Sequence, residues 1–257
     1  MIRDSFQGIR YFLRGFSLIG KPGIRRFVII PFLLNVLVFS LLIYYSYDQF
    51  GYFLDWLIPS EDSWLNWLRW ILIPIFFSVV AVAMFFLFTI VASVLSAPFC
   101  APLASAVEFH LTGKADTSEF VWKDFLASIL PSIFSELQKM LYYIVISLPF
   151  IILFAIAFFI PVLNIVASIA WLLVTAWILA VQYSDYAFDN HNIAFPELRQ
   201  RLGKRRFLAF GFGGSTMLMM SIPVLNFILI PVAIAGATAM SFNEFEIEAG
   251  HELRTSA

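Results

Sequence analysis

Charged residues are absent from long stretches of this chain. From Met140 to Ser184, 45 consecutive residues include no Asp, Glu, Lys or Arg. Three further stretches share this property: Phe27–Tyr47, Trp70–Val107 and Phe207–Asn243. A soluble domain rarely needs a charge-free run of such length, whereas about 20 apolar residues cover the hydrocarbon core of a bilayer. The sequence therefore predicts an integral membrane protein built from helices, and its longest run is sufficient for two passes and a turn.

Other absences narrow the class further. The single cysteine, Cys100, lies inside an apolar run, so the chain has no disulfide framework. A net charge of -1 argues against a nucleic-acid partner. His251-Glu252 lacks the second histidine of a zinc-protease motif, and neither Gly-x-Ser-x-Gly nor a complete phosphate-binding loop occurs. We therefore expect no enzyme activity, no metal site and no cofactor. Apolar residues are abundant instead, at 61% of the chain against 13% charged.

The first half of the chain predicts two spans. Phe27–Tyr47 forms the first, and the second runs from about Trp70 to Ala92. The segment that follows, Ser96–Ser105, contains two prolines and several small residues. Prolines break helical hydrogen bonding, and broken backbone at membrane depth is tolerated only against protein or a water-filled cavity. The sequence leaves open whether this segment lines a functional cavity or is a packing kink.

The second half predicts two apolar hairpins. They share the turn sequence Ile-Pro-Val-Leu-Asn, at Ile160–Asn164 and at Ile222–Asn226. The arms of the last hairpin, Phe207–Ile222 and Phe227–Phe242, are about 24 Å long as helices, at 1.5 Å per residue. Because the hydrocarbon core is about 30 Å thick, we expect this hairpin to be re-entrant or partly inserted. The depth of the 140–184 hairpin stays open.

Two segments predict amphipathic helices at the membrane surface. The first 26 residues combine six Lys/Arg with an apolar face, which is typical of a helix lying among lipid headgroups. That face consists of Ile9, Phe12, Leu13 and Phe16. Residues 117–140 predict a second amphipathic helix, interrupted near Pro131.

The distribution of positive charge predicts an orientation. Residues 185–206 carry five Lys/Arg, as compared with four acids and one Arg in 48–69. The positive-inside rule therefore places the N-terminal segment and 185–206 in the cytoplasm, and 48–69 outside. A bias this local is also compatible with dual insertion.

The clearest candidate binding site is Pro22-Gly23-Ile24-Arg25-Arg26, at the start of the first span. Proline and glycine favour a helix start, where free N–H groups and the positive end of the dipole attract an oxyanion. Two guanidiniums add donors that stay protonated, so the segment suits a tetrahedral dianion such as sulfate, which only accepts hydrogen bonds. The alternative is a pair of positive-inside anchors on lipid phosphates, and the residues alone favour this anchor. Arg205 and Arg206, in Gly203-Lys-Arg-Arg-Phe207, allow the same two interpretations.

Several ionisable residues lie beside the apolar runs. A charge at the bilayer centre costs roughly 2.5–3.5 kcal/mol or more, so such groups usually face a cavity or a partner. Glu108 and His110 follow the proline-containing segment directly, and Glu136 precedes the long apolar hairpin. Glu136 and Lys139 also have the spacing of a surface ion pair one turn apart. Three groups close the long hairpin, where a capped helix end is favoured over a transport role: Asp185, Asp189 and His191.

Three segments resemble the CysZ family of bacterial sulfate transporters. The first is Leu18-Ile-Gly-Lys-Pro-Gly-Ile-Arg-Arg-Phe-Val-Ile-Ile-Pro31, which is similar to the family's N-terminal signature. The others are Ala176-Trp-Ile-Leu-Ala-Val-Gln-Tyr-Ser-Asp-Tyr-Ala-Phe-Asp-Asn-His191 and Ile230-Pro-Val-Ala-Ile-Ala-Gly-Ala-Thr-Ala-Met240. They occur in the family's order, and the resemblance extends over nearly the whole chain.

The resemblance implies a multi-pass protein of the bacterial inner membrane that imports sulfate for cysteine biosynthesis and depends on protons. It implies an all-α fold of two full transmembrane helices and two partly inserted or re-entrant hairpins, with amphipathic interfacial helices. Residues 1–257 would form a single membrane-embedded domain that contacts lipids and assembles as a homo-oligomer.

The resemblance also implies roles for particular residues. The family's Gly-Leu-Arg sulfate motif falls on Gly23, Ile24, Arg25 and Arg26, with isoleucine in place of leucine. This reverses the preference for lipid anchors and makes the segment the expected sulfate site. Support for a place on the permeation path or in proton coupling is weaker, and it concerns Glu108, His110 and Glu136.

A second class of function remains compatible with these patterns. The chain would then be a membrane scaffold or an accessory subunit of a transport system, with its arginines on lipid headgroups. Selectivity distinguishes the two, because a lipid anchor does not discriminate sulfate from chloride. Both a channel and an alternating-access mechanism fit the sequence.

Overall fold

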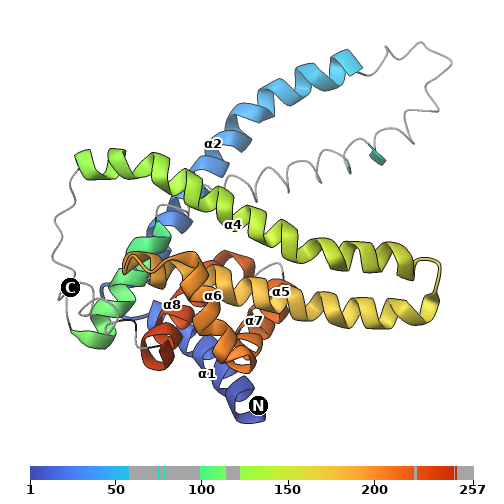
Figure 1. The fold of residues 1–257 in the computed structure, drawn as a ribbon. Helices are drawn as coiled ribbons and strands as arrows, with labels where there is room; N and C mark the ends of the chain where they lie inside the picture. The colour runs from blue at the N-terminus through green and yellow to red at the C-terminus, as the bar shows by residue number, and fades with distance from the viewer. Residues whose placement is uncertain are drawn as a thin grey trace. The chain divides into compact units, whose positions relative to one another are not determined.

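The computed structural model of the chain describes residues 1–57, 74–75, 78, 99–113, 122–222, 225–245 and 247. Within these ranges every regular element is a helix, and no strand is present. The prediction of an all-α membrane protein is confirmed. The described chain forms two compact units, one of Met1–Arg25 with Cys100–Ala257 and the other of Arg26–Phe99. Figure 1 labels the helices of both.

The second unit contains α2 (Arg26–Leu57), which includes the predicted first span. Large apolar side chains of α2 are exposed, among them Ile29, Leu33 and Leu37. A helix with such a surface is stable in lipid rather than in water. Pro31 lies inside the helix, and its carbonyl accepts a hydrogen bond of 2.8 Å from the Asn35 side chain. The predicted second span, Trp70–Ala92, falls almost wholly outside the described residues.

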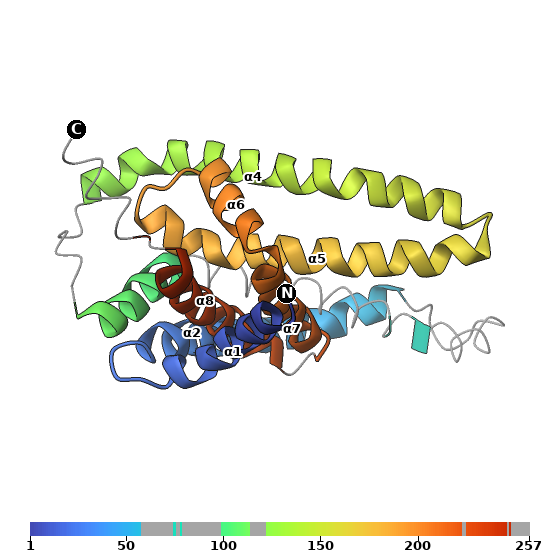
Figure 2. The same cartoon turned by 60° about the horizontal axis from the view of Figure 1, so that its bottom comes forward.

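In the first unit, α1 (Ile2–Ile19) packs against α7 (Arg206–Met220) and α8 (Asn226–Phe245). Figure 2 shows the three helices together. Glycines permit this close packing, because a Cβ on Gly8 would lie 2.2 Å from the Leu208 carbonyl oxygen of α7. A Cβ on Gly15 would likewise lie 2.1 Å from the Val232 carbonyl oxygen of α8. The backbones of α1 and its neighbours therefore touch directly.

The buried face of α1 differs from the predicted apolar face. Gly8, Phe12, Gly15 and Leu18 are buried, whereas Leu13 is 56% exposed. Phe12 packs edge-on against Phe212 of α7 at 6.0 Å between ring centroids. The sequence pattern identified an amphipathic helix but could not show that glycines would carry the contact, because glycine contributes nothing to an apolar face. α1 is docked on protein through this face.

The helices α4 (Trp122–Ala157) and α5 (Pro161–Asn190) form a long hairpin (Figure 1). The predicted interruption near Pro131 is wrong, since α4 continues through this residue. Proline is tolerated inside membrane helices when neighbouring groups satisfy the freed carbonyl. The predicted turn is shifted: residues 158–160 connect the helices, and Pro161 is the first residue of α5. Proline at this position needs no hydrogen-bonded N–H.

Among the described residues, three helical segments are long and apolar enough to cross a membrane: Gln138–Ala157, Leu163–Asn190 and Ile228–Phe245. Both arms of the long hairpin therefore qualify. In the last hairpin α7 has 15 residues, as the short-arm prediction requires, but α8 has 20 because it continues beyond Phe242. The prediction that an arm of this hairpin is too short to span the hydrocarbon core therefore holds for the length of α7 and not for that of α8.

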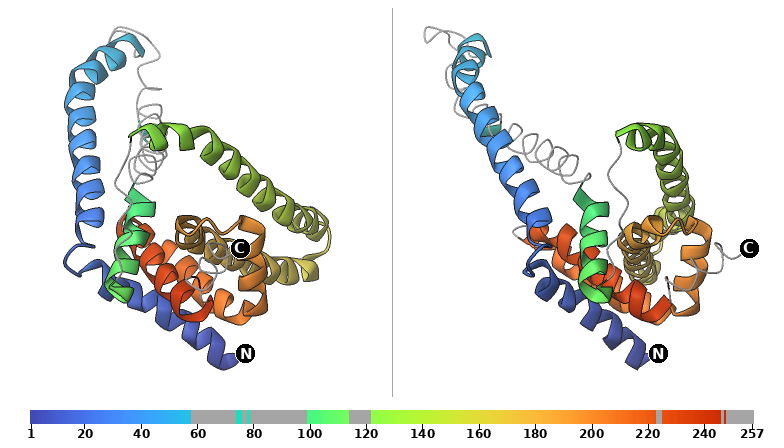
Figure 3. Two further views of the ribbon diagram at one scale, coloured as in Figure 1. Left: turned by 60° about the vertical axis from the view of Figure 1, so that its left-hand side comes forward. Right: turned by 90° about the vertical axis from the view of Figure 1, so that its left-hand side faces the viewer.

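Two shorter helical segments meet the end of α5. One is α6 (Phe195–Lys204), which begins with Pro196 in its first turn. The other is the helical segment 100–112, whose buried side includes Leu103, Ala104 and Val107. It continues through Pro102. Both views of Figure 3 show this green segment beside the red α8.

Candidate functional site

The segment from Gly23 to Arg26 connects α1 to α2 and has a defined local conformation. Gly23 has φ of +87°, a left-handed conformation that glycine adopts without strain. Ile24 is only 1% exposed, whereas Arg25 and Arg26 are both exposed. The buried isoleucine thus anchors the segment, and the two guanidiniums that follow it lie at the surface.

Two backbone donors of this segment are already used. The N–H groups of Ile24 and Arg25 both donate to the Lys21 carbonyl, at 3.1 Å each. The expected contribution of these two amides to anion binding is therefore reduced, because a tight turn precedes α2. The guanidiniums are the stronger donors that remain. Neither makes an ion pair with the described residues, and the Arg26 guanidinium lies 4.7 Å from the centroid of the Phe27 ring.

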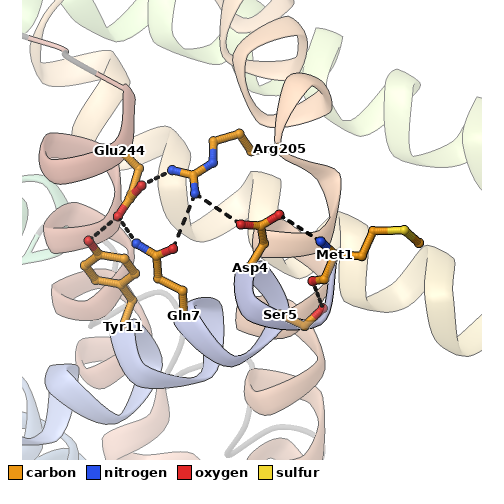
Figure 4. A network of polar contacts seen from close by, with 7 residues as sticks. All are labelled: Met1, Asp4, Ser5, Gln7, Tyr11, Arg205 and Glu244. Carbon is orange, nitrogen blue, oxygen red and sulfur yellow. Dashed lines mark hydrogen bonds and ion pairs between the residues drawn. The ribbon is translucent and has the colours of Figure 1, made fainter.

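The second basic segment is arranged differently. Arg205, between α6 and α7, forms an ion pair with Glu244 of α8 and a longer one of 3.5 Å with Asp4 of α1. Gln7 and Tyr11 of α1 also donate hydrogen bonds to Glu244, the latter at 2.5 Å. Figure 4 shows these side chains converging from three parts of the chain. Arg205 therefore holds helices together and is not available as an anion ligand, while Arg206 is exposed.

Glu108 lies in the segment 100–112, and its partner is His191 at the end of α5. The Nε2 atom of His191 is 3.0 Å from Oε1 of Glu108, and the two side chains are 13% and 19% exposed. His110, a separate candidate from the sequence, is exposed. Residues two apart on a helix point in different directions, so the structure does not bring His110 and Glu108 to one face.

Lys139 of α4 is buried against α5. Its Nζ atom is 2.5 Å from Asp185 and 3.9 Å from Asp189. The sequence allowed Lys139 to be one member of a surface ion pair with Glu136. This is wrong, because Lys139 is only 4% exposed and does not lie at the surface. Glu136 lies in α4, and its side chain is outside the described part of the structure. The ion pair thus joins the two arms at the end of the charge-free run.

The end of α5 makes more contacts than the sequence predicted. The sequence favours a capped helix end for Asp185, Asp189 and His191, and the structure adds that Asp185 and His191 pair with two other segments. Asn190 adds bonds of 3.2 Å to the Ala101 carbonyl and 3.0 Å to the Ser105 hydroxyl. One signal was present in the sequence: Asp185 and Glu108 are the first charged residues after two separate charge-free runs.

Comparison with known proteins supports one relationship over nearly the full length. The family described as "Sulfate transporter CysZ/Etoposide-induced protein 2.4" matches residues 11–231. A protein of Pseudomonas aeruginosa (strain LESB58) named "Sulfate transporter CysZ" is 40% identical over 234 residues, which cover 91% of this chain and 94% of that protein.

Two further relatives bear the same name, "Sulfate transporter CysZ". The Pseudomonas fluorescens protein is 40% identical over 90% of this chain and 91% of its own length. The Vibrio cholerae protein (strain El Tor Inaba N16961) is 37% identical over 95% of this chain and 96% of its own length. Identity at this level over whole chains, together with the family match, shows that this membrane protein belongs to the sulfate transporter CysZ/etoposide-induced protein 2.4 family.

Proposed function

We propose that this protein transports sulfate across the bacterial inner membrane and supplies sulfur for cysteine biosynthesis. The observation that carries the proposal is the near-complete overlap with relatives named sulfate transporters, at 36–40% identity. Three helices in the described part of the chain are long and apolar enough to cross a membrane, which fits a multi-pass transporter. The proposal treats residues 1–257 as one membrane-embedded domain that acts as a homo-oligomer among lipids.

Sulfate is held, in this proposal, by Gly23, Ile24, Arg25 and Arg26. The side chains fit an anion with only acceptor atoms, because guanidiniums donate and do not lose their protons. Both are exposed at the beginning of a membrane helix, and no carboxylate among the described residues neutralises them. Gly23 and the buried Ile24 set the backbone conformation that presents them.

The transport step is proton-dependent in this proposal. Moving a dianion inward against 100 mV, inside negative, costs about 4.6 kcal/mol, or twice 2.3 kcal/mol. Protons that accompany sulfate would offset this cost, as would rapid consumption of internal sulfate. The groups proposed from the sequence for the permeation path or for coupling are Glu108, His110 and Glu136.

The direct test is uptake of radiolabelled sulfate by proteoliposomes that contain only this protein. The double variant Arg25→Ala/Arg26→Ala is compared with Arg10→Ala/Arg14→Ala, which removes two exposed arginines of α1. Wild type and the α1 variant should transport sulfate, and the Arg25/Arg26 variant should lose transport. Chloride at equal ionic strength should not compete.

Each contrary result has a defined meaning. Absence of flux from folded wild-type protein would contradict the transport proposal and favour an accessory subunit or scaffold. Equal loss in both double variants would show that general positive charge, as in lipid anchoring, is what the arginines supply. Loss in neither would remove Arg25 and Arg26 from the sulfate site while leaving transport intact.

A further inference from the structure

The end of α5 is a meeting point of polar groups that the predicted anion site does not use. The segment 100–112 contributes Ser105 and Glu108, and α5 contributes Asn190 and His191. The α8 helix closes one side, where the Phe242 ring lies 5.3 Å from the His191 ring, between centroids. Two segments more than 80 positions apart in sequence are therefore joined by polar contacts of Asn190 with the Ala101 carbonyl and the Ser105 hydroxyl, and of His191 with Glu108.

The Glu108–His191 pair combines two properties that a proton-binding site needs. Its atoms lie 3.0 Å apart, so the imidazole and the carboxylate share a hydrogen bond. Its side chains are mostly but not completely buried, so a proton can still reach them. Imidazole is also the side chain whose charge changes between about pH 5 and 8.

Other charged groups around the pair have different surroundings. On α5 itself, Asp185 pairs with Lys139 of α4, and Asp189 is 65% exposed. On the segment 100–112, His110 is exposed, and the Cys100 side chain shares a hydrogen bond with the Tyr186 side chain of α5. On α8, Glu244 is held by Arg205, and on α6 Arg201 binds Glu197 at 2.6 Å. The Glu108–His191 pair thus differs from these neighbours, because its carboxylate is paired with an imidazole and theirs are paired with lysine or arginine.

We infer that Glu108 and His191 form the proton-binding pair of the transport cycle, an inference that rests on the proposed sulfate transport. With a neutral imidazole the pair carries one negative charge, and with a protonated imidazole it carries none. A proton bound here therefore removes a charge that repels an incoming dianion. By reciprocity, sulfate in the protein favours binding of the proton. Of the groups proposed from the sequence, Glu108 thus gains His191 as its partner, whereas His110 is exposed and lies outside the pair.

The decisive experiment measures sulfate flux into proteoliposomes across a pH series. His191→Gln retains a hydrogen-bond donor toward Glu108 but removes the titratable ring, and Glu108→Gln removes the carboxylate. The matched control is Glu197→Gln, which removes an ion-paired carboxylate from α6. Wild type and the control should change their flux by about fivefold or more between acidic and alkaline pH. His191→Gln and Glu108→Gln should vary by less than about twofold over the same range.

Opposite outcomes separate this inference from the proposed function. Wild-type flux with an unchanged pH profile in His191→Gln overturns the inference and leaves sulfate transport intact. Wild-type flux that does not depend on pH would also overturn the inference and leave sulfate transport intact. No wild-type flux at any pH contradicts the proposed function itself.

A measurement on the wild-type protein covers the case in which the variants do not fold. The chain has only three histidines, so histidine labelled in the ring can be assigned by NMR. The His191 signal should titrate and shift toward the protonated form when sulfate is added, whereas chloride should leave it unchanged. A His191 ring that does not respond to sulfate at any pH overturns the inference.

Discussion

Two similar sequences, Gly23-Ile-Arg-Arg-Phe27 and Gly203-Lys-Arg-Arg-Phe207, have different structures in this protein. In the first, the glycine has a positive φ and the next residue is buried. In the second, the glycine lies inside α6 and the next residue, Lys204, is exposed. The arginines follow in both, yet those of the first segment lack ion pairs with the described residues, whereas Arg205 is held by Glu244.

The difference shows that a basic sequence does not define an anion site by itself. Carboxylates of α1 and α8 neutralise Arg205. In the sequence, Asp4 of α1 lies 201 positions from Arg205 and Glu244 of α8 lies 39 positions from it. The guanidinium of Arg205 is therefore occupied by carboxylates of the protein itself. The Gly23 segment keeps its guanidiniums exposed at the start of α2, which is what the proposed anion site requires.

Arg205→Ala gives the largest expected effect, because it breaks the pair that distinguishes the two segments. Glu244, whose side chain is 11% exposed, would lose its cationic partner. We expect a loss of about 2 kcal/mol in the free energy of unfolding, less than for a fully buried pair because Arg205 is 32% exposed. Thermal unfolding in detergent measures it, with Arg206→Ala as the control. Unchanged stability combined with lost sulfate flux would assign Arg205 to the anion site instead.

Replacing both arginines of the first segment by lysine sharpens the comparison. Arg25→Lys/Arg26→Lys keeps the positive charge but removes the planar fork that binds two oxygens of an oxyanion. We expect sulfate flux to fall by about tenfold, or about 1.4 kcal/mol, without a change in unfolding temperature. Flux equal to that of wild type would show that point charges are sufficient, as expected for anchors on lipid phosphates.

Alanine at the two glycines should act with opposite signs. Gly23→Ala meets no atom within 4 Å but retains φ of +87°, so it should cost about 1 kcal/mol or move the arginines. Gly203→Ala is equally free of contacts and lies in a helix, so it should stabilise by up to about 1 kcal/mol. Unfolding temperature and the KM for sulfate distinguish the results. A neutral Gly23→Ala variant would contradict the role of the left-handed turn.

The smallest expected effect is a pH dependence within the Arg205 cluster. The hydrogen bond from the Met1 ammonium, followed by the interaction with Arg205, lowers the pKa of Asp4 below its usual 3.8. A lowered pKa in the folded state means that the contribution to stability is present above pH 3.8 and is lost as the pH falls through the folded-state pKa. Unfolding curves of wild type and Asp4→Asn should therefore converge in acid. A constant difference at all pH values would contradict this assignment.

Much of the architecture follows from local sequence. Runs without charge predict membrane helices because lipid penalises charge wherever it occurs, and both arms of the long hairpin are helices long and apolar enough to cross a membrane. Pro131 was misread because a proline interrupts a helix only when neighbouring groups cannot satisfy the freed carbonyl. The docking of α1 was underestimated because Gly8 and Gly15 add no hydrophobicity while permitting close contact.

The sequence by itself determined the class of protein, its helices, its family and the ionisable groups beside the apolar runs. Only the tertiary structure decided which of those groups are paired: Lys139 with Asp185, Glu108 with His191, and Arg205 with Glu244. The reason is physical, since hydrophobicity and helix formation depend on residues a few positions apart. An ion pair depends instead on which helices pack together, and therefore on segments that lie far apart in the chain.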